Sequence, residues 1–220
     1  MGVLGSLLPA KGVVTLARAL RAVDSPALAL ELHGPQADFH GERSHLDELR
    51  SLAAADPRLR LCGAYAHDDL PRVLARLDVV AAPAEWDEVY GLSVREARAA
   101  GLGVLVSDRG GLPAAADGGR AGLVVPSGDA AAWSAALRRC VAEPALLEAW
   151  RAAPHGLRDE RSMLLEHERL YAELTLAVTG RLPALAHAIP GVTPEPQPEE
   201  PPAPERGGLL GRLFGRDRRR

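Results

Sequence analysis

The stretch "LDVVAAPAEWDEVYGLSVREARAAGLGVLVS", Leu77 to Ser107, decides the fold because it contains two strands and the helix between them. Its first run, Leu77–Pro83, and its last, Gly103–Ser107, are almost continuously apolar, which is typical of strands buried on both faces of a sheet. Between them an acidic loop ends at Gly91, and an alanine-rich segment predicts a helix over Leu92–Ala100. Strand, helix and strand in this order predict a βαβ unit with a right-handed crossover.

The same alternation extends from the first residue to about Gly128. Four more strands are predicted, at Gly2–Leu8, Ala27–His33, Leu59–Gly63 and Ala121–Pro126. Four more helices are predicted, at Val13–Ala22, Ser44–Ala55, Asp69–Arg76 and Leu112–Ala116. Alternation this regular predicts an α/β protein with a Rossmann-like parallel sheet flanked by helices.

Helix signals continue beyond the last predicted strand. Asp129 precedes "AAAWSAALRRCVAE" and is expected to cap that helix, as Asp68 is expected to cap the helix over 69–76. A long helix, with Ser162–Thr179 as its main part, closes the folded region near Gly180. We therefore expect residues 1–180 to form one domain.

The composition changes sharply after that domain. Residues 181–205 form a Pro/Glu-rich linker, since Pro190–Glu205 alone holds seven prolines and four glutamates and cannot build a core. We expect this tail to be disordered and extended. Residues 206–220 are basic, with leucines that would form an apolar stripe in a helix. Arg206–Arg220 is interpreted either as a peripheral contact with an anionic membrane or a protein partner, or as a solvated tail.

Charge and composition narrow the function classes. The 220 residues carry a net charge of −3, which argues against an overall electrostatic grip on nucleic acid. No apolar run approaches the roughly 20 residues that span a bilayer, and the N-terminus lacks the charged region of a signal peptide. The sequence is therefore interpreted as cytoplasmic. Cys62 and Cys140 lie far apart, and His40 and His45 have no third ligand nearby, so no metal site is expected.

The loop after the first strand, Gly5–Gly12, contains Lys11, which is the only lysine among 26 basic residues. Its order of residues matches neither a phosphate loop nor a dinucleotide fingerprint. What it offers is backbone N–H groups near Gly5 and Ser6 and one ammonium, at the edge of the sheet where ligands of parallel sheets bind. This combination suits a diphosphate.

The loop before the helix over 92–100 contains the second group of candidates. Gly91, Leu92 and Ser93 provide the first N–H groups of that helix, which lack intrahelical acceptors and favour an anion. Glu88 and Glu96 stand on either side, and a carboxylate there can accept hydrogen bonds from the hydroxyls of a ribose or a pyranose. The alternative is that Glu96 only complements the helix dipole and Glu88 is solvated. A third segment, Ser107–Pro113, has a glycine pair that either approaches a ligand or forms a turn.

These segments, in this order and spacing, resemble the C-terminal, donor-binding lobe of family-4 glycosyltransferases of the GT-B fold. The matching sequences are "GSLLPAKGV", "DVVAAPAEWDEVYGLSVREARAAGLGVLVSDRGGLP" and "AGLVVPSGD". The central motif of that family is reproduced by Glu88, Tyr90, Gly91, Leu92 and Glu96. The resemblance implies retaining transfer of a sugar from a nucleotide sugar, with no bound metal ion and no cofactor beyond the donor substrate.

By resemblance, Glu96 would hold the ribose, Glu88 the sugar and Lys11 the diphosphate, with Lys11 and Glu88 as the catalytic pair. Gly5, Ser6, Tyr90, Gly91 and Leu92 would complete the donor site, and Cys62–Tyr65 would lie near the base. The sequence departs from the family pattern at three positions. Ser6 stands where an arginine is common, Gly103 replaces a proline, and Ala114 replaces a glutamate.

The resemblance also implies a partner, because GT-B enzymes bind the acceptor on an N-terminal lobe that we do not find in this sequence. The sequence leaves open a fragment, a separate chain or second copy that completes the cleft, and a remnant. The alternative function is a non-catalytic interaction module that keeps the fold of the lobe. A dinucleotide-dependent oxidoreductase would also fit the sheet, but its glycine fingerprint is missing.

Overall fold

A computed structural model describes residues 1–154, 156 and 160–180. The linker over 181–205 and the basic tail over 206–220 lie outside the described residues, so the expectations for them stay predictions. The described part divides into a first unit, Met1–Leu157, and a second unit from Arg158 onward. In the second unit the structure describes one helix, α7 (Glu160–Thr179), which contains the predicted closing helix.

The first unit is built on a six-stranded sheet in which all neighbouring strands run parallel, in the order β3-β2-β1-β4-β5-β6. The strands are β1 (Gly2–Leu4), β2 (Leu30–His33), β3 (Leu59–Gly63), β4 (Val79–Ala82), β5 (Gly103–Ser107) and β6 (Gly122–Val125). This is the predicted Rossmann-like parallel sheet. The strand order reverses between β1 and β4, which makes their carboxyl ends the expected place for a ligand.

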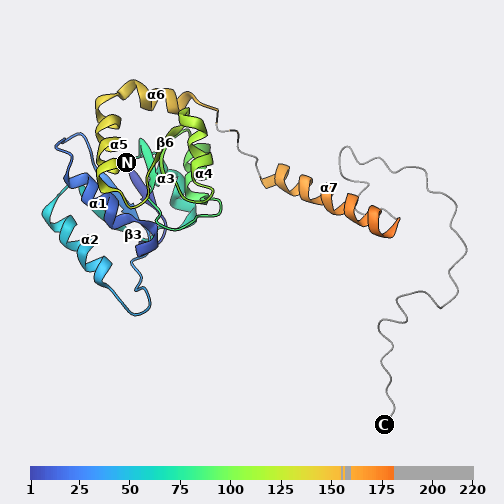
Figure 1. Ribbon diagram of the computed structural model, residues 1–220, viewed down its shortest axis with the longest axis horizontal. Helices are drawn as coiled ribbons and strands as arrows, with labels where there is room; N and C mark the ends of the chain where they lie inside the picture. The colour runs from blue at the N-terminus through green and yellow to red at the C-terminus, as the bar shows by residue number, and fades with distance from the viewer. Residues whose placement is uncertain (155, 157–159, 181–220) are drawn as a thin grey trace, which may run out of the picture. The chain divides into compact units, whose positions relative to one another are not determined.

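Helices cover both faces of this sheet (Figure 1). The helices of the first unit are α1 (Val13–Arg21), α2 (Ser44–Ala55), α3 (Leu70–Leu74), α4 (Leu92–Ala99), α5 (Ala130–Ala142) and α6 (Pro144–Ala152). Short 3₁₀ turns add η1 (Pro9–Lys11), η2 (His67–Asp69) and η3 (Pro113–Gly119). One hydrophobic cluster joins α1, α2 and α5 to the sheet, and a second joins α3, α4 and η3 to the opposite face.

Successive residues of the central strands enter different clusters. In β4, Val79 and Ala81 pack in the first cluster and Val80 in the second. In β5, Leu105 belongs to the first cluster, whereas its neighbour Val104 belongs to the second. Side chains of a strand alternate between the two faces of the sheet, so both faces of these strands are buried, as their continuous apolar runs predict.

Some predicted boundaries are wrong, for local reasons. The strand over 2–8 ends at Leu4, because Gly5 takes a positive φ of 121° that ends the extended backbone. The segment over 112–116 forms the 3₁₀ turn η3, which is interrupted by left-handed residues at Asp117 and Gly118. Asp68 lies inside η2 and caps no helix, whereas the Asp129 carboxylate accepts hydrogen bonds from the N–H groups of Ala131 and Ala132, as predicted.

Among the helices that the structure describes, none combines the length and the apolar character needed to cross a membrane.

Candidate functional site

Two loops at the carboxyl edge of the sheet are joined to each other by their backbones. The loop after β1 turns at Gly12, whose φ is 65°, and a Cβ there would overlap the carbonyl oxygen of Pro83. Next to this close approach, the N–H of Glu85 donates to the carbonyl of Ala10 over 2.8 Å. The hydroxyl of Thr15 in α1 also donates to the Glu85 carboxylate, over 2.6 Å. The glycine therefore brings the loop of Lys11 against the loop that follows β4.

The glycine pair in the segment Ser107–Pro113 also lets two stretches of backbone approach closely. The N–H of Gly111 donates to the carbonyl of Glu88 over 2.6 Å. A Cβ on Gly110 would overlap that same carbonyl, and one on Gly111 would overlap the carbonyl of Val89. The two glycines therefore allow a close approach between backbones, which fixes the segment that carries Glu88.

Lys11 and Glu88 meet across these loops, although 77 positions separate them in the sequence. Lys11 Nζ donates to Glu88 Oε2 over 2.5 Å, and both side chains are mostly buried. The indole Nε1–H of Trp86 donates to the same Oε2 over 3.1 Å. The Trp86 ring also lies under the ammonium, with Lys11 Nζ 4.9 Å from a ring centroid. Lys11, Trp86 and Glu88 form a closed triangle, which we call the Lys11 triangle.

The start of α4 lies beside the Lys11 triangle. Gly91 takes a φ of 71°, and its carbonyl accepts hydrogen bonds from the N–H groups of Val94 and Arg95. The preceding N–H groups, of Leu92 and Ser93, point out of the helix end, which carries a partial positive charge.

Glu96 follows one turn into α4 and differs from Glu88 in its surroundings. It is half-buried, and its carboxylate makes no hydrogen bond or ion pair with another described residue. Burial of Tyr65 raises the pKa of its hydroxyl, and the nearby charge of Glu96 raises it further. Tyr65 and Glu96 line the same cavity, and the Glu96 carboxylate is available to accept hydrogen bonds from a ligand.

All eight site residues that the sequence predicts line one cavity of about 480 Å³. They are Gly5, Ser6, Lys11, Glu88, Tyr90, Gly91, Leu92 and Glu96. The cavity opens between the ends of β1 and β4, the switch point of the sheet. The sequence reasoning missed Trp86, which stands two residues before Glu88, and it named Tyr65 only as the end of a segment. What each of the eight residues binds stays a prediction.

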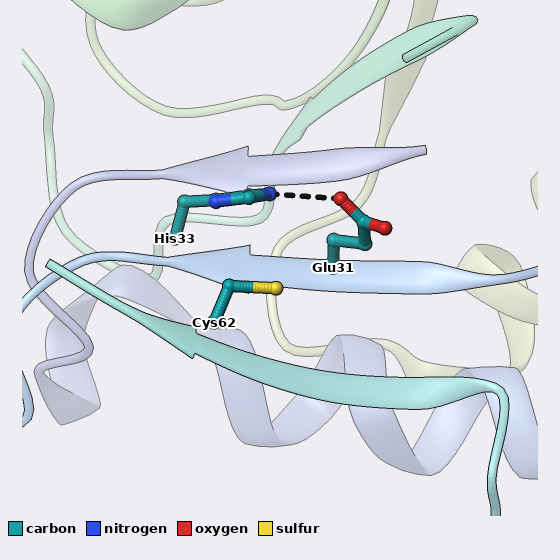
Figure 2. Close-up of side chains that lie close together, drawn as sticks. All are labelled: Glu31, His33 and Cys62. Atoms are coloured by element: carbon teal, nitrogen blue, oxygen red, sulfur yellow. Dashed lines mark hydrogen bonds and ion pairs between the residues drawn. The ribbon is translucent and has the colours of Figure 1, made fainter. Parts of the chain in front are cut away.

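A second cluster contains residues that could ligate a metal, which the sequence reasoning did not predict. Glu31, His33 and Cys62 each place one ligand atom within 4.8 Å of the others, and they project from β2 and β3 toward one another (Figure 2). The His33 Nε2 lies 3.0 Å from Glu31 Oε2. Since an ionised carboxylate only accepts hydrogen bonds, this nitrogen carries a proton and is not free to bind a metal ion as the side chains stand.

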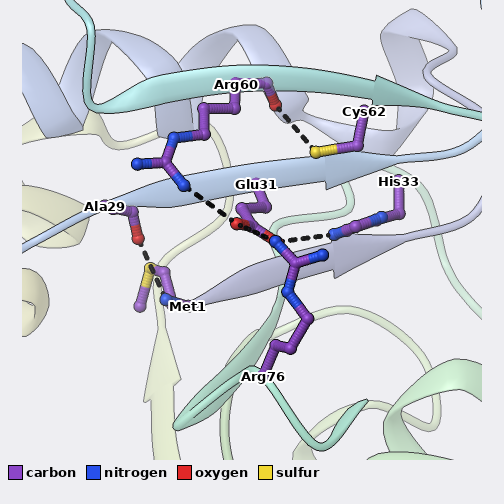
Figure 3. A network of polar contacts seen from close by, with 7 residues as sticks. All are labelled: Met1, Ala29, Glu31, His33, Arg60, Cys62 and Arg76. Atoms are coloured by element: carbon purple, nitrogen blue, oxygen red, sulfur yellow. Dashed lines mark hydrogen bonds and ion pairs between the residues drawn. The ribbon is translucent and has the colours of Figure 1, made fainter. Parts of the chain in front are cut away.

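The other carboxylate oxygen of Glu31 is already paired. Arg60 and Arg76 each donate to Glu31 Oε1 over 3.3 Å, as Figure 3 shows. Burial alone would raise the pKa of Glu31, but the hydrogen bond with His33 and the charges of Arg76 and Arg60 lower it overall. Burial raises the pKa of the Cys62 thiol, which disfavours the thiolate that a metal needs. Glu31 and His33 are therefore best described as the buried centre of an ion network with Arg60 and Arg76, and the two arginines oppose a cation there.

Comparisons with known proteins identify the family and the fold of this chain. Residues 1–143 match the family model "Glycosyl transferases group 1". A D-inositol 3-phosphate glycosyltransferase of Rhodococcus opacus is 33% identical over 153 residues, which are 67% of this chain and 34% of that protein. One of Salinispora arenicola is 33% identical over 61% of this chain and 31% of its own length. The chain spans only 25–35% of the curated relatives it matches first.

Solved structures share the fold. The sucrose-phosphate synthase of Thermosynechococcus elongatus aligns with a TM-score of 0.68 and 27% identity over 80% of this chain and 46% of that one. HepE of Anabaena, crystallised with UDP, aligns with a TM-score of 0.58 and 24% identity over 68% of this chain and 42% of its own, a likeness that shows the fold alone. The narrower assignment to family 4 stays a prediction. From its sequence match and its fold, the chain belongs to the group 1 glycosyl transferases and has the Rossmann-like half of a GT-B fold.

Proposed function

We propose that this chain is the donor-binding part of a glycosyltransferase and that its cavity holds a nucleoside diphosphate sugar. The observation that carries this proposal is the contrast between two carboxylates in one cavity. Glu88 is paired with Lys11, whereas Glu96 forms no hydrogen bond or ion pair with a described residue. A cavity with a cation, a helix start and a free carboxylate matches a ligand that combines phosphates with vicinal hydroxyls.

Each group has a proposed role. Lys11 and the N–H groups of Gly91 and Leu92 bind the diphosphate, whose charge they partly neutralise. Glu96 accepts hydrogen bonds from the ribose hydroxyls, and Glu88 contacts the transferred sugar. Tyr65, which lines the same cavity as Glu96, borders the base. Gly5, Ser6 and Tyr90 shape the remaining walls of the cavity.

For transfer, the acceptor must reach the sugar from outside this unit. We propose that a second lobe supplies the acceptor, either from a longer form of the same protein, from another chain or from a second copy. Lys11 then stabilises the negative charge that develops on the departing diphosphate, while Glu88 contacts the sugar that is transferred. No metal ion is assigned a role in this proposal, and the nucleotide sugar is the substrate.

Calorimetric titration of the purified chain with UDP, ADP and GDP tests the proposal, with UDP first because HepE is crystallised with UDP. Loss of a hydrogen bond to a charged group costs about 1.5–3 kcal/mol. Glu96→Gln and Lys11→Met are therefore expected to weaken the nucleotide that binds by about tenfold or more.

Asp87→Asn is the matched control for these variants. Asp87 is an exposed carboxylate in the same loop that does not line the cavity, so its loss should leave the affinity within about twofold of wild type. If the wild-type chain binds none of the three nucleotides, the donor site is wrong and the interaction module becomes the better description.

A further inference from the structure

Trp86 is unusually exposed for a tryptophan of this chain. Its indole is 49% exposed, whereas the other two tryptophans, Trp133 and Trp150, are almost completely buried. Single apolar side chains are often exposed on protein surfaces, so exposure alone assigns Trp86 no role, and its contacts carry the argument. Trp86 does not line the cavity itself, yet it contacts two residues that do, Lys11 and Glu88.

The residue before Trp86 is held by two hydrogen bonds. Glu85 is held on one side by the carbonyl of Ala10 and on the other by the hydroxyl of Thr15, so the chain enters Trp86 from an anchored residue. The ring then lies against the ammonium of Lys11 while its Nε1–H reaches Glu88 Oε2. The indole therefore touches the cation with its face and the anion with its edge.

This arrangement matters because a diphosphate would compete with Glu88 for Lys11. In the structure, Glu88 Oε2 is the only carboxylate oxygen that pairs with Lys11 among the described residues. When a phosphate draws the Lys11 ammonium away from Glu88, the cation–π contact with Trp86 can persist. The uncharged ring attracts the ammonium and does not compete with the phosphate as its anionic partner. The Nε1–H still holds Glu88, which has then lost the lysine.

We propose that Trp86 is a positioning residue of the donor site, which keeps Lys11 over the diphosphate and Glu88 toward the sugar while their mutual ion pair is exchanged. This inference rests on the proposed function. It assigns no chemical step to Trp86, which acts through the two residues that it contacts.

A double-mutant cycle with UDP as the probe tests the contact with Lys11. Trp86→Leu is expected to weaken UDP binding by about threefold to tenfold, with an unchanged midpoint of thermal unfolding because the ring is half exposed. In a Lys11→Met background the same replacement is expected to cause no further loss, since the ring then has no cation to hold. Additive losses would overturn the inference, because Trp86 would then act independently of Lys11.

A conservative variant separates the two contacts of the indole. Trp86→Phe keeps an aromatic face for Lys11 and removes the Nε1–H that holds Glu88. We expect it to retain UDP affinity within about twofold and to weaken UDP-glucose by a larger factor, because only the sugar depends on Glu88. An equal loss for both probes would contradict the assigned contacts.

Phe39→Leu is the control for removing an exposed aromatic, since Phe39 is 40% exposed and lies outside the cavity lining. It should leave UDP affinity unchanged. If Lys11→Met and Glu96→Gln weaken UDP and Trp86→Leu does not, the positioning role alone is wrong. If the wild-type chain does not bind UDP, the positioning role for a UDP donor fails together with that donor assignment.

Discussion

At the scale of one residue, the buried side chain of Arg98 joins two segments by hydrogen bonds to their carbonyls. It is 2% exposed, and its guanidinium donates to the carbonyls of Leu102 and Trp150 and, beyond them, of Ala153 and Pro154, over 3.0–3.3 Å. These carbonyls lie before β5 and at the end of α6, so Arg98 ties the two together. Burial lowers the pKa of Arg98, although the charge of Asp117 opposes this shift. The sequence reasoning missed Arg98, because an arginine in a helix normally indicates a solvent-facing position.

We predict that Arg98→Met lowers the free energy of unfolding by about 2–3 kcal/mol, because a side chain of similar length would leave several carbonyls without a donor. Urea denaturation measures this change. Arg72→Met is the control, since Arg72 is exposed and makes one bond of 3.5 Å, and it should cost less than about 0.5 kcal/mol. Equal stability of the two variants would mean that water satisfies the carbonyls of α6.

The two cysteines are predicted to differ in reactivity. Burial raises the pKa of Cys140 to about 11, and the side chain has little access to solvent. Cys62 is exposed on the edge strand, although partial burial and the charge of Glu31 raise its pKa as well. At pH 8 a thiol reagent should label one equivalent, Cys62, in the folded chain and the second only in denaturant. Cys62→Ser should abolish labelling of the folded chain, and labelling of both thiols at one rate would contradict this prediction.

At the scale of elements, the sequence predicts best where one pattern of apolar residues runs through a whole segment. The bounds of α2, β3 and β5 agree with the predicted segments, because the helical spacing of α2, the alternation of β3 and the continuous apolar run of β5 each persist to the end of the segment. The end of β1 and the form of η3 depend instead on single backbone angles, at Gly5 and at Asp117 and Gly118. Periodicity carries no information about those angles, so these boundaries were missed.

Gly12 lets the loop of Lys11 approach the loop that follows β4, and its replacement tests this contact. Gly12→Ala should destabilise the chain for two reasons: its φ of 65° is strained for alanine, and the new methyl group overlaps the Pro83 carbonyl. Gly101→Ala is the matched control, since its φ is 77° but a methyl group there would meet no neighbouring atom within 4 Å. Strain alone should cost about 1–2 kcal/mol in Gly101→Ala. Gly12→Ala should cost more and also weaken UDP, and equal losses in urea denaturation would contradict the contact.

At the scale of the whole molecule, the candidate site could be predicted because the topology gathers it. A parallel sheet places the loops after β1 and β4 at one edge, so Lys11, Glu88 and Glu96 were expected near each other. Their pairing could not be predicted, since it depends on the joined backbones that bring Glu88 to Lys11 and leave Glu96 unpaired among the residues that the structure describes. The ion network of Glu31 was missed for a similar reason, because its arginines come from β3 and from beyond α3.

The acid stability of the whole chain should depend on two buried carboxylates. The hydrogen bond from Arg58 lowers the pKa of Asp56, and contacts with His33, Arg76 and Arg60 lower that of Glu31 despite its burial. A pKa that is lower in the folded state adds stability above the unfolded value, about 4, and this stability is lost as the pH falls through the folded value. Urea denaturation from pH 7 down to pH 3 should therefore show a falling free energy of unfolding.

In Glu31→Gln, the free energy of unfolding should change less steeply with pH below pH 5, whereas the exposed-site control Asp87→Asn should follow wild type. Coincident slopes for wild type and Glu31→Gln would show that the ion network does not stabilise the fold.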